Sequence, residues 1–192
     1  MRCHAADSVS QNSEYISSTN RPIRSATERA ASPRDHAAWK LTVCPLRIAA
    51  NDPLANHKTC SRLLQVMAAA NARALGADES LLLNTDGEVT EGGTSNVFWI
   101  ERGTVCTTPL ATGVLPGVTR AVVLEICAAL NIPCAEKVIR LEALLSCDGV
   151  FVTLGSRGVV EAASVDETTL RRSPLTGRLR TEFEALLRRE CA

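Results

Sequence analysis

The sequence of 192 residues lacks an excess of charge of either sign, since 21 basic and 21 acidic residues leave a formal net charge of zero. A domain that binds nucleic acid usually carries a basic excess, so we expect no nucleic-acid partner. No apolar run reaches the roughly 18 residues of a membrane span, and the N-terminal segment has no continuous apolar core of a secretory signal. We therefore expect a cytoplasmic protein with no membrane partner.

Lysine is scarce, and cysteine is not. Lys40, Lys58 and Lys137 are the only lysines among the 21 basic residues, which leaves few candidates for a catalytic lysine. The eight cysteines include no pair at C-x-x-C spacing, so we predict no metal site and no redox motif. Without a secretory signal we expect free thiols, most of them small core residues.

The first part of the chain differs in composition from the rest. The stretch from Ser8 to Ser32 is rich in Ser, Thr, Asn, Arg and Ala and has few large apolar residues. Such a stretch buries little surface, so we expect residues 1–38 to form a disordered or non-homologous tail. From Trp39 onward the pattern is globular, and we predict one domain over residues 39–192.

Hydrophobic periodicity predicts an α+β (mixed α/β) fold, because strands and helices mix without a strict βαβ alternation. In the first helix, the predicted inward stripe is Leu63, Met67, Ala70 and Ala74. Asp86-Gly87 indicates a hairpin turn, and Pro45 is expected to end the first strand. The predicted strands are residues 41–43, 81–83, 97–100, 104–107, 149–153 and 158–165, and the predicted helices are 59–75, 117–130, 141–145 and 175–189.

Two polar segments in the first half could carry chemistry. Lys58 directly precedes the first predicted helix, and a lysine held in a dry cavity is a competent nucleophile toward aldehydes. The alternative is a solvated lysine at a helix start. Glu91 is followed by Gly92 and Gly93, which let the backbone pass close to a ligand. The alternative is a solvated hairpin loop.

Two further segments could bind an anion. Gly113-Val114-Leu115-Pro116-Gly117 opens the second predicted helix, and free N–H groups at a helix N-terminus suit phosphate. The Gly155 turn joins two predicted strands and also offers N–H groups. Each has a plainer interpretation, an ordinary loop before a helix and an ordinary hairpin.

Taken together and in this order, the segments "HKT..RL", "GADESLLLNTDGEVTEGGTSNVFWI" and "TPLATGVLPGVTR" resemble the class IV aminotransferases, the fold-type IV pyridoxal-phosphate enzymes. That family includes branched-chain and D-amino-acid aminotransferases and aminodeoxychorismate lyase. The resemblance runs from about Trp39 to the C-terminus. It implies the C-terminal cofactor-binding domain of the D-amino-acid aminotransferase-like fold, pyridoxal 5′-phosphate as cofactor, and a homodimer.

The resemblance also implies roles for individual residues. Lys58 matches the catalytic Schiff-base lysine, and Glu91 matches the carboxylate that keeps the cofactor's ring nitrogen protonated. Leu115 matches the apolar residue against the ring face. The cofactor's phosphate is assigned to Val118 and Thr119 at a helix start, with Gly155 in a second phosphate segment where the family pattern is weaker.

Two departures from the family pattern keep alternatives open. Ser61-Arg62 stands where branched-chain aminotransferases carry Asn-Tyr, which favours the lyase or D-amino-acid branch. Residues 1–38 do not resemble the family's smaller N-terminal domain, so we expect a truncated chain. The predicted function is amino transfer between an amino acid and a 2-oxo acid. The alternatives are aminodeoxychorismate lyase, which forms 4-aminobenzoate and pyruvate, and a catalytically inactive remnant.

Overall fold

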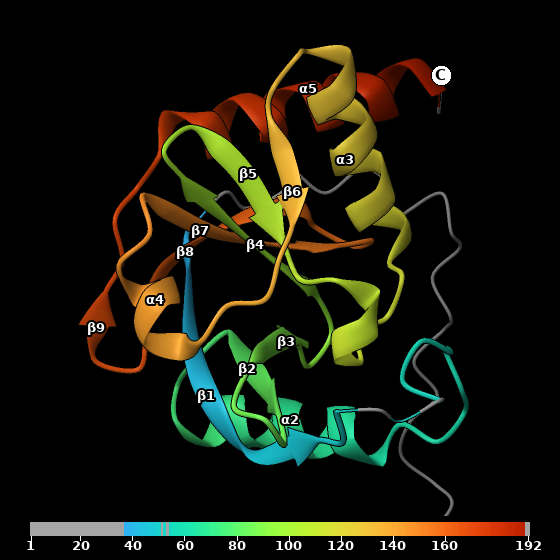
Figure 1. The fold of residues 1–192 in the computed structure, drawn as a ribbon, viewed down its shortest axis with the longest axis vertical. Helices are drawn as coiled ribbons and strands as arrows, with labels where there is room; N and C mark the ends of the chain where they lie inside the picture. The colour runs from blue at the N-terminus through green and yellow to red at the C-terminus, as the bar shows by residue number, and fades with distance from the viewer. Residues whose placement is uncertain (1–36, 51, 53, 191–192) are drawn as a thin grey trace, which may run out of the picture. The chain divides into compact units, whose positions relative to one another are not determined.

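The computed structural model describes residues 37–50, 52 and 54–190. The predicted tail thus lies almost wholly outside the described residues, and its boundary stays a prediction. Strands and helices mix as expected for the α+β (mixed α/β) class, which confirms the predicted fold class (Figure 1). The strands are β1 (Trp39–Ile48), β2 (Glu79–Asn84), β3 (Val89–Gly92), β4 (Asn96–Glu101), β5 (Thr104–Thr107), β6 (Cys134–Glu136), β7 (Gly149–Leu154), β8 (Gly158–Val165) and β9 (Thr168–Thr169). The helices are α2 (Leu63–Ala74), η1 (Leu110–Thr112), α3 (Val118–Ala129), α4 (Leu141–Leu145) and α5 (Pro174–Glu190).

Six strands close into a ring. The strand order is β3-β2-β1-β8-β7-β4-β5-β6, and an additional pairing joins β3 to β4. That pairing is a short antiparallel one between Glu91 and Asn96. The ring brings residues far apart in the sequence into direct register, which matters for the site described below.

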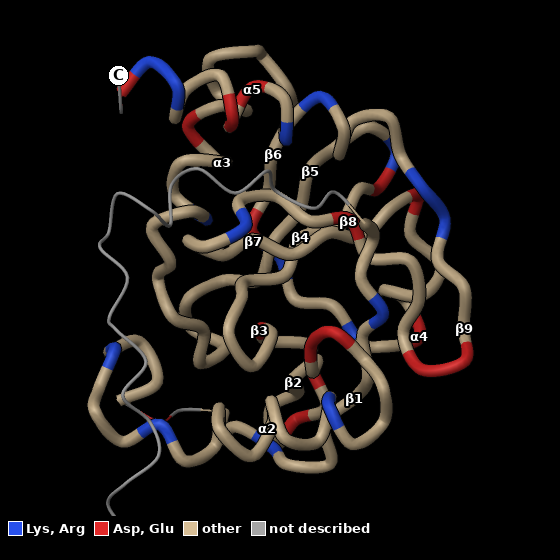
Figure 2. Tube along the Cα trace, turned by 180° about the vertical axis from the view of Figure 1, so that it is seen from behind, with Lys and Arg blue, Asp and Glu red and all other residues tan. Residues whose placement is uncertain are grey.

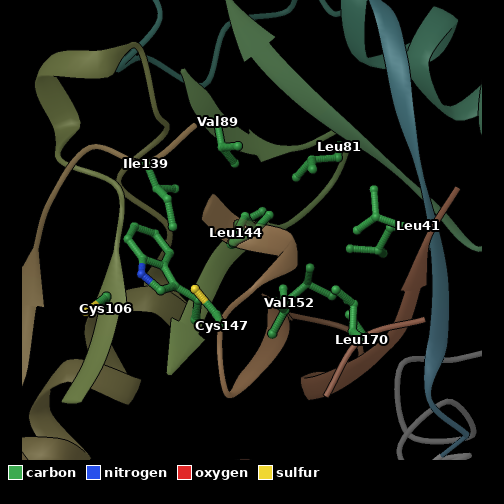
Figure 3. Packing of buried hydrophobic residues seen from close by; sticks show 14 of the residues in the cluster. Leu41, Leu81, Val89, Cys106, Ile139, Leu144, Cys147, Val152 and Leu170 are labelled. Carbon is green, nitrogen blue, oxygen red and sulfur yellow. The ribbon is translucent and has the colours of Figure 1, made fainter. Parts of the chain in front are cut away.

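Five strands of the ring, β2, β3, β4, β7 and β8, are largely buried on both faces, whereas β1 keeps exposed positions such as Lys40 and Pro45. Side chains along the buried strands alternate between the two faces with a period of two. In β4, Val97 and Trp99 pack into one core, while Phe98 and Ile100 pack into another. The first core fills the interior of the ring, and Figure 3 shows Leu144 of α4 among its strand residues. The second core lies between the outside of the ring and α3 and α5, where Phe98 stacks on Phe151 at a centroid distance of 5.0 Å. Strands covered on both faces read as continuous apolar runs, as here.

Helices cover the two outer sides of the sheet. α3 and α5 pack against each other and against β7 and β8, whereas α2 packs on β1 and β2 (Figure 1). A third, smaller core of Cys44, Ile48, Ala68 and Leu82 lies under α2. β2 therefore alternates between the first and third cores, since Leu81 and Leu83 belong to the first.

The Asp86-Gly87 hairpin is confirmed, but the end of the first strand was placed wrongly. Gly87 has a φ of 79°, which a glycine adopts without steric cost. β1 continues past Pro45 to Ile48, although we expected Pro45 to end it. The register of β1 against β2 shifts between Val43 and Arg47, so Pro45 lies at an irregularity where a missing N–H is tolerated.

The first helix is present, but its start and its buried face differ from the prediction. α2 begins at Leu63 rather than at Thr59. Its buried residues are Ala68 and Ala72, whereas Leu63 and Met67 of the predicted stripe are 69% and 46% exposed. Small residues bring α2 close to the sheet: the Ser80 hydroxyl donates to the carbonyl of Ala68 at 2.7 Å. The apolar pattern fits two faces, and this close approach selects the face of alanines.

Six cysteines lie among the described residues and all are free. Cys44, Cys106, Cys127 and Cys147 are buried, and burial raises the pKa of the Cys127 and Cys147 thiols to about 11. No helix in the described ranges is long and apolar enough to cross a membrane. Figure 2 shows basic and acidic positions interspersed along the described trace.

Candidate active site

One cavity of about 420 Å³ collects every predicted site residue. It lies where β3 ends, β4 begins and β7 ends, with the N-terminus of α3 on one side and the loop before α2 on the other. The six predicted residues that line it are Lys58, Glu91, Leu115, Val118, Thr119 and Gly155. Segments distant in the sequence thus form one site, although the role of each residue stays a prediction.

The strand register supplies the polar floor of the cavity. Glu91 of β3 pairs with Asn96 of β4, and Asn96 pairs with Thr153 of β7. Three polar side chains from three neighbouring strands therefore stand in a row across the sheet. All three line the cavity and are buried.

Glu91 is the buried acid of the site. It is 7% exposed, and desolvation raises the pKa of its carboxyl to about 7. The hydrogen bond from the Leu115 N–H and the charge of Arg62 act in the opposite direction, but burial dominates. A carboxyl with a pKa near 7 takes up or releases a proton at physiological pH. It would ionise fully once a cationic group bound beside it.

The Leu115 segment holds Glu91 in place. The Leu115 N–H donates to Glu91 Oε2 at 3.0 Å, and Asn96 Nδ2 donates to the Leu115 carbonyl at 2.8 Å. Both polar groups of the Leu115 backbone are thus satisfied by strand side chains. Leu115 itself is half-buried and lines the cavity, in accord with an apolar wall beside the carboxylate.

Lys58 lies in a loop, whereas we predicted that it directly precedes a helix. The residue is exposed and lines the cavity, and α2 begins only at Leu63. Short polar side chains favour this extension of the loop, because the Thr59 hydroxyl donates to the Ser61 carbonyl at 3.3 Å. Such local bonds offer the backbone an alternative to helix. Lys58 therefore belongs to a wall of the cavity that the strands do not form.

The start of α3 has the features that suit an anion. Among the described residues no side chain caps it, and its first turn contains no acidic residue. Val118 and Thr119 begin the helix and line the cavity. Arg120 anchors this end from behind, since it is 5% exposed, donates to the Thr108 carbonyl at 3.1 Å and pairs with Glu136 at 2.8 Å. The free N–H groups and the helix dipole favour a phosphate here.

Gly155 and Thr153 complete the same wall at the end of β7. Gly155 has open space where a side chain would begin, with no heavy atom within 4 Å. The Thr153 hydroxyl is buried and has no hydrogen-bond partner among the described residues, yet Thr153 lines the cavity. A buried polar atom without a partner costs free energy unless a ligand satisfies it. Together with the α3 terminus, this hydroxyl fits a bound phosphate or ring oxygen of a cofactor.

Several site residues were missed by reasoning from the sequence. Thr153 ends the predicted strand 149–153, but only strand register shows that it neighbours Asn96. Arg62 was noted for its family pattern and not as a site residue, although it lines the cavity and acts on Glu91. Arg62 follows Lys58 by only four positions in the sequence, and this closeness could have marked it as a candidate site residue.

Comparison with known proteins identifies the family. The model of the family described as "Amino-transferase class IV" matches residues 7–165. The chain belongs to the class IV aminotransferases. This membership confirms the resemblance drawn from the lysine, glutamate and helix-start segments.

Individual relatives differ in activity. A D-alanine aminotransferase from Bacillus licheniformis is 33% identical over 138 residues, which is 70% of this chain and 48% of the relative. A putative 4-amino-4-deoxychorismate lyase structure from Legionella pneumophila superposes with a TM-score of 0.76 at 26% identity, covering 80% of this chain and 58% of the other. A branched-chain aminotransferase from Thermoproteus uzoniensis, solved with norvaline, has a TM-score of 0.77 at 31% identity, covering 80% and 52%. The chain thus spans about half the length of these relatives.

Proposed function

We propose that this chain binds pyridoxal 5′-phosphate at the cavity and takes part in amino transfer between an amino acid and a 2-oxo acid. The observation that carries the proposal is the shared cavity of Lys58 and Glu91, an amine and a buried acid that line one space of ligand size. The bound cofactor supplies an aldehyde for attachment and an electron-accepting ring. A homodimer and an amino-acid substrate are part of the same proposal.

The donor set fits the cofactor at each end. Glu91 suits the ring nitrogen, because a buried carboxyl with a pKa of about 7 gains most from a neighbouring N–H that can carry a positive charge. The α3 terminus and the Gly155 turn suit the phosphate. Leu115 gives an apolar contact between the two ends.

Lys58 and Glu91 divide the proton chemistry. The Lys58 amine would attach the cofactor through its aldehyde carbon and, when released, accept or return a proton at the carbon that reacts. Glu91, ionised beside the ring, would hold the proton on the ring nitrogen. Asn96 holds the Leu115 backbone through its carbonyl, and the Leu115 N–H in turn fixes the orientation of the Glu91 carboxyl through Oε2.

The first experiment is simple to control because the chain has only three lysines, Lys40, Lys58 and Lys137. The purified chain is incubated with pyridoxal 5′-phosphate, and the visible absorbance of the protein-bound cofactor is recorded for wild type, Lys58→Ala and the double variant Lys40→Arg/Lys137→Arg. Lys40 and Lys137 do not line the cavity, so the double variant is the matched control. We expect a visible band in wild type and control that Lys58→Ala abolishes.

Borohydride reduction followed by peptide mapping locates the attached cofactor on a lysine. Attachment at Lys40 or Lys137, or at no lysine, would reject the proposal and favour the inactive remnant. A band that shifts when amino acids are added would support an exchangeable site for amino transfer. A band that no amino acid alters would reject the transfer reaction.

A second candidate function is aminodeoxychorismate lyase. Ser61 and Arg62 both line the cavity, at the positions where the resemblance puts Asn-Tyr in branched-chain enzymes. The similarity to the Legionella protein points the same way. Release of pyruvate from aminodeoxychorismate without any added 2-oxo acid would support the lyase. Dependence on a 2-oxo acid would support the aminotransferase.

A further inference from the structure

A second buried carboxylate lies behind the cavity wall and is not used by the proposed chemistry. Glu79, the first residue of β2, is 3% exposed and does not line the cavity. Its Oε2 accepts hydrogen bonds from the Thr94 N–H at 3.1 Å, the Thr94 hydroxyl at 2.6 Å and the Ser95 hydroxyl at 3.2 Å. Its Oε1 accepts from the Ser80 N–H at 2.9 Å. Thr94 and Ser95 themselves line the cavity.

Two glycines allow this carboxylate to lie directly under the loop. A side chain at Gly92 would begin 3.1 Å from Glu79 Cγ, and one at Gly93 would begin 3.1 Å from Glu79 Oε1 and 3.2 Å from Ala68 Cβ. The loop of residues 92–95 is thus fixed between Glu79 and α2. The Gly-Gly pair, for which we predicted a close approach to a ligand, lines the cavity and also approaches a carboxylate of the protein.

Bonds to Glu79 and to two backbone carbonyls decide which hydrogen-bonding groups the loop can offer. The Gly92 N–H donates to the Ser95 carbonyl at 2.6 Å, and the Gly93 N–H donates to the Ser80 carbonyl at 2.9 Å. The Thr94 N–H is taken by Glu79. A hydroxyl has one hydrogen, and those of Thr94 and Ser95 are also directed to Glu79, so both oxygens can only accept from a ligand. Five donors of the loop are thus directed to acceptors of the protein, which leaves it few donors for an anion in the cavity.

We propose that Glu79 is a positioning residue, which withdraws the Thr94 N–H and the Thr94 and Ser95 hydroxyl hydrogens from the cavity and so leaves the two hydroxyl oxygens as acceptors on the wall beside Glu91. A phosphate is then left with one favourable end of the cavity, the N-terminus of α3 with the Gly155 turn. Glu79 thereby sets the direction in which the cofactor enters. The inference rests on the proposed function and goes beyond it by assigning the cofactor's orientation to a residue that does not touch it.

The test compares four single variants and one double variant. Glu79→Gln keeps the shape of the side chain, but its amide has one oxygen to accept the four hydrogen bonds that the Glu79 carboxylate accepts. Thr94→Val removes the hydroxyl, and Thr94→Ser retains it. Glu161→Gln is the matched control, because Glu161 is also a buried carboxylate on a strand, 8% exposed, but bonds Arg172 and does not line the cavity.

We expect Glu79→Gln and Thr94→Val each to raise the Kd for pyridoxal 5′-phosphate by about tenfold, as for loss of a charged hydrogen bond. The double variant Glu79→Gln/Thr94→Val should be no weaker than either single one, because both act through the same contact. Thr94→Ser and Glu161→Gln should bind as wild type does. Additive effects in the double variant, or an equal loss in Glu161→Gln, would overturn the proposal.

A second readout does not depend on the cofactor. Amide hydrogen exchange of the chain without cofactor should show protection at Thr94 that Glu79→Gln removes and Glu161→Gln preserves. If wild type shows no band that depends on Lys58, the proposed function is rejected, and exchange alone then decides the role of Glu79. If the Thr94 amide of Glu79→Gln stays protected from exchange, the proposed role of Glu79 is overturned. A loss of protection confined to loop 92–95 would support that role.

Discussion

At the scale of the residue, Glu91 makes the stability of the chain depend on pH. Its carboxyl has a pKa of about 7 in the fold against an ordinary value of 4.5, so the folded chain holds a proton that the unfolded chain has released. The resulting stabilisation is fully present below the unfolded value and is lost as pH rises to 7. The shift corresponds to a contribution on the order of 3 kcal/mol.

We predict that Glu91→Gln removes this dependence. The free energy of unfolding of wild type minus that of the variant should fall as the pH rises from the ordinary carboxyl value of 4.5 to about 7 and then level off. Urea denaturation at several pH values measures the free energy of unfolding of both proteins. Subtracting one from the other cancels the contribution of the other carboxyls, which titrate in both. A difference that is constant across this range would show that the Glu91 carboxyl is not desolvated in the fold.

The Thr153 hydroxyl gives a second prediction at this scale. Thr153→Val replaces a buried hydroxyl that has no partner in the described structure with a methyl group of similar shape. We therefore expect the free energy of unfolding to stay equal or rise by about 1 kcal/mol, while the Kd for pyridoxal 5′-phosphate rises. Thr153→Ser, which keeps the hydroxyl, is the control for affinity. Loss of stability with unchanged affinity would assign the hydroxyl to the fold and not to the site.

At the scale of the element, α2 shows how packing selects one face of an apolar helix. Leu63, Val66 and Met67 are largely exposed, while Ala68 is buried on the sheet. We predict that Leu63→Gln and Met67→Gln change the free energy of unfolding by no more than about 0.5 kcal/mol. Ala72→Leu should cost about 1–3 kcal/mol, because a larger side chain cannot enter the contact with the sheet.

Chemical denaturation of the three α2 variants decides between the two faces. If Leu63→Gln cost more than Ala72→Leu, the face expected from the stripe would be the buried one. The exposed apolar side chains are an aggregation liability in a lone chain. Variants should therefore be compared at low concentration.

At the scale of the whole molecule, the ring of six strands places the site across the ends of three neighbouring strands, β3, β4 and β7. Glu91, Asn96 and Thr153 become neighbours only because β3 pairs with β4 and β4 with β7. The chain spans about half the length of the relatives it matches.

The proposed homodimer is tested by sedimentation equilibrium on the purified chain. We expect twice the mass of the chain, with dissociation on dilution. Leu63→Glu/Met67→Glu serves as a second sample, because charges on the exposed face of α2 would show whether that face takes part in association. A monomer at all concentrations would contradict the homodimer.

The sequence by itself determined the protein family and the fold class. The lysine, the glutamate before two glycines and the helix start are local patterns, and each can be found because its residue types and spacing carry the signal. The strands over residues 97–100 and 158–165 and the hairpin at Asp86-Gly87 follow from periodicity and turn chemistry, which also depend on near neighbours.

Only the tertiary structure decided which side of α2 is buried, how far β1 extends past Pro45, and which polar side chains share the cavity. These outcomes depend on contacts between segments distant in the sequence. The pairing of Asn96 with Thr153 and the bonds from Thr94 to Glu79 are set by strand register and loop packing, which no local pattern encodes. Glu79 was not predicted as a site residue, because its hydrogen bonds to Thr94 and Ser95 are visible only in the fold.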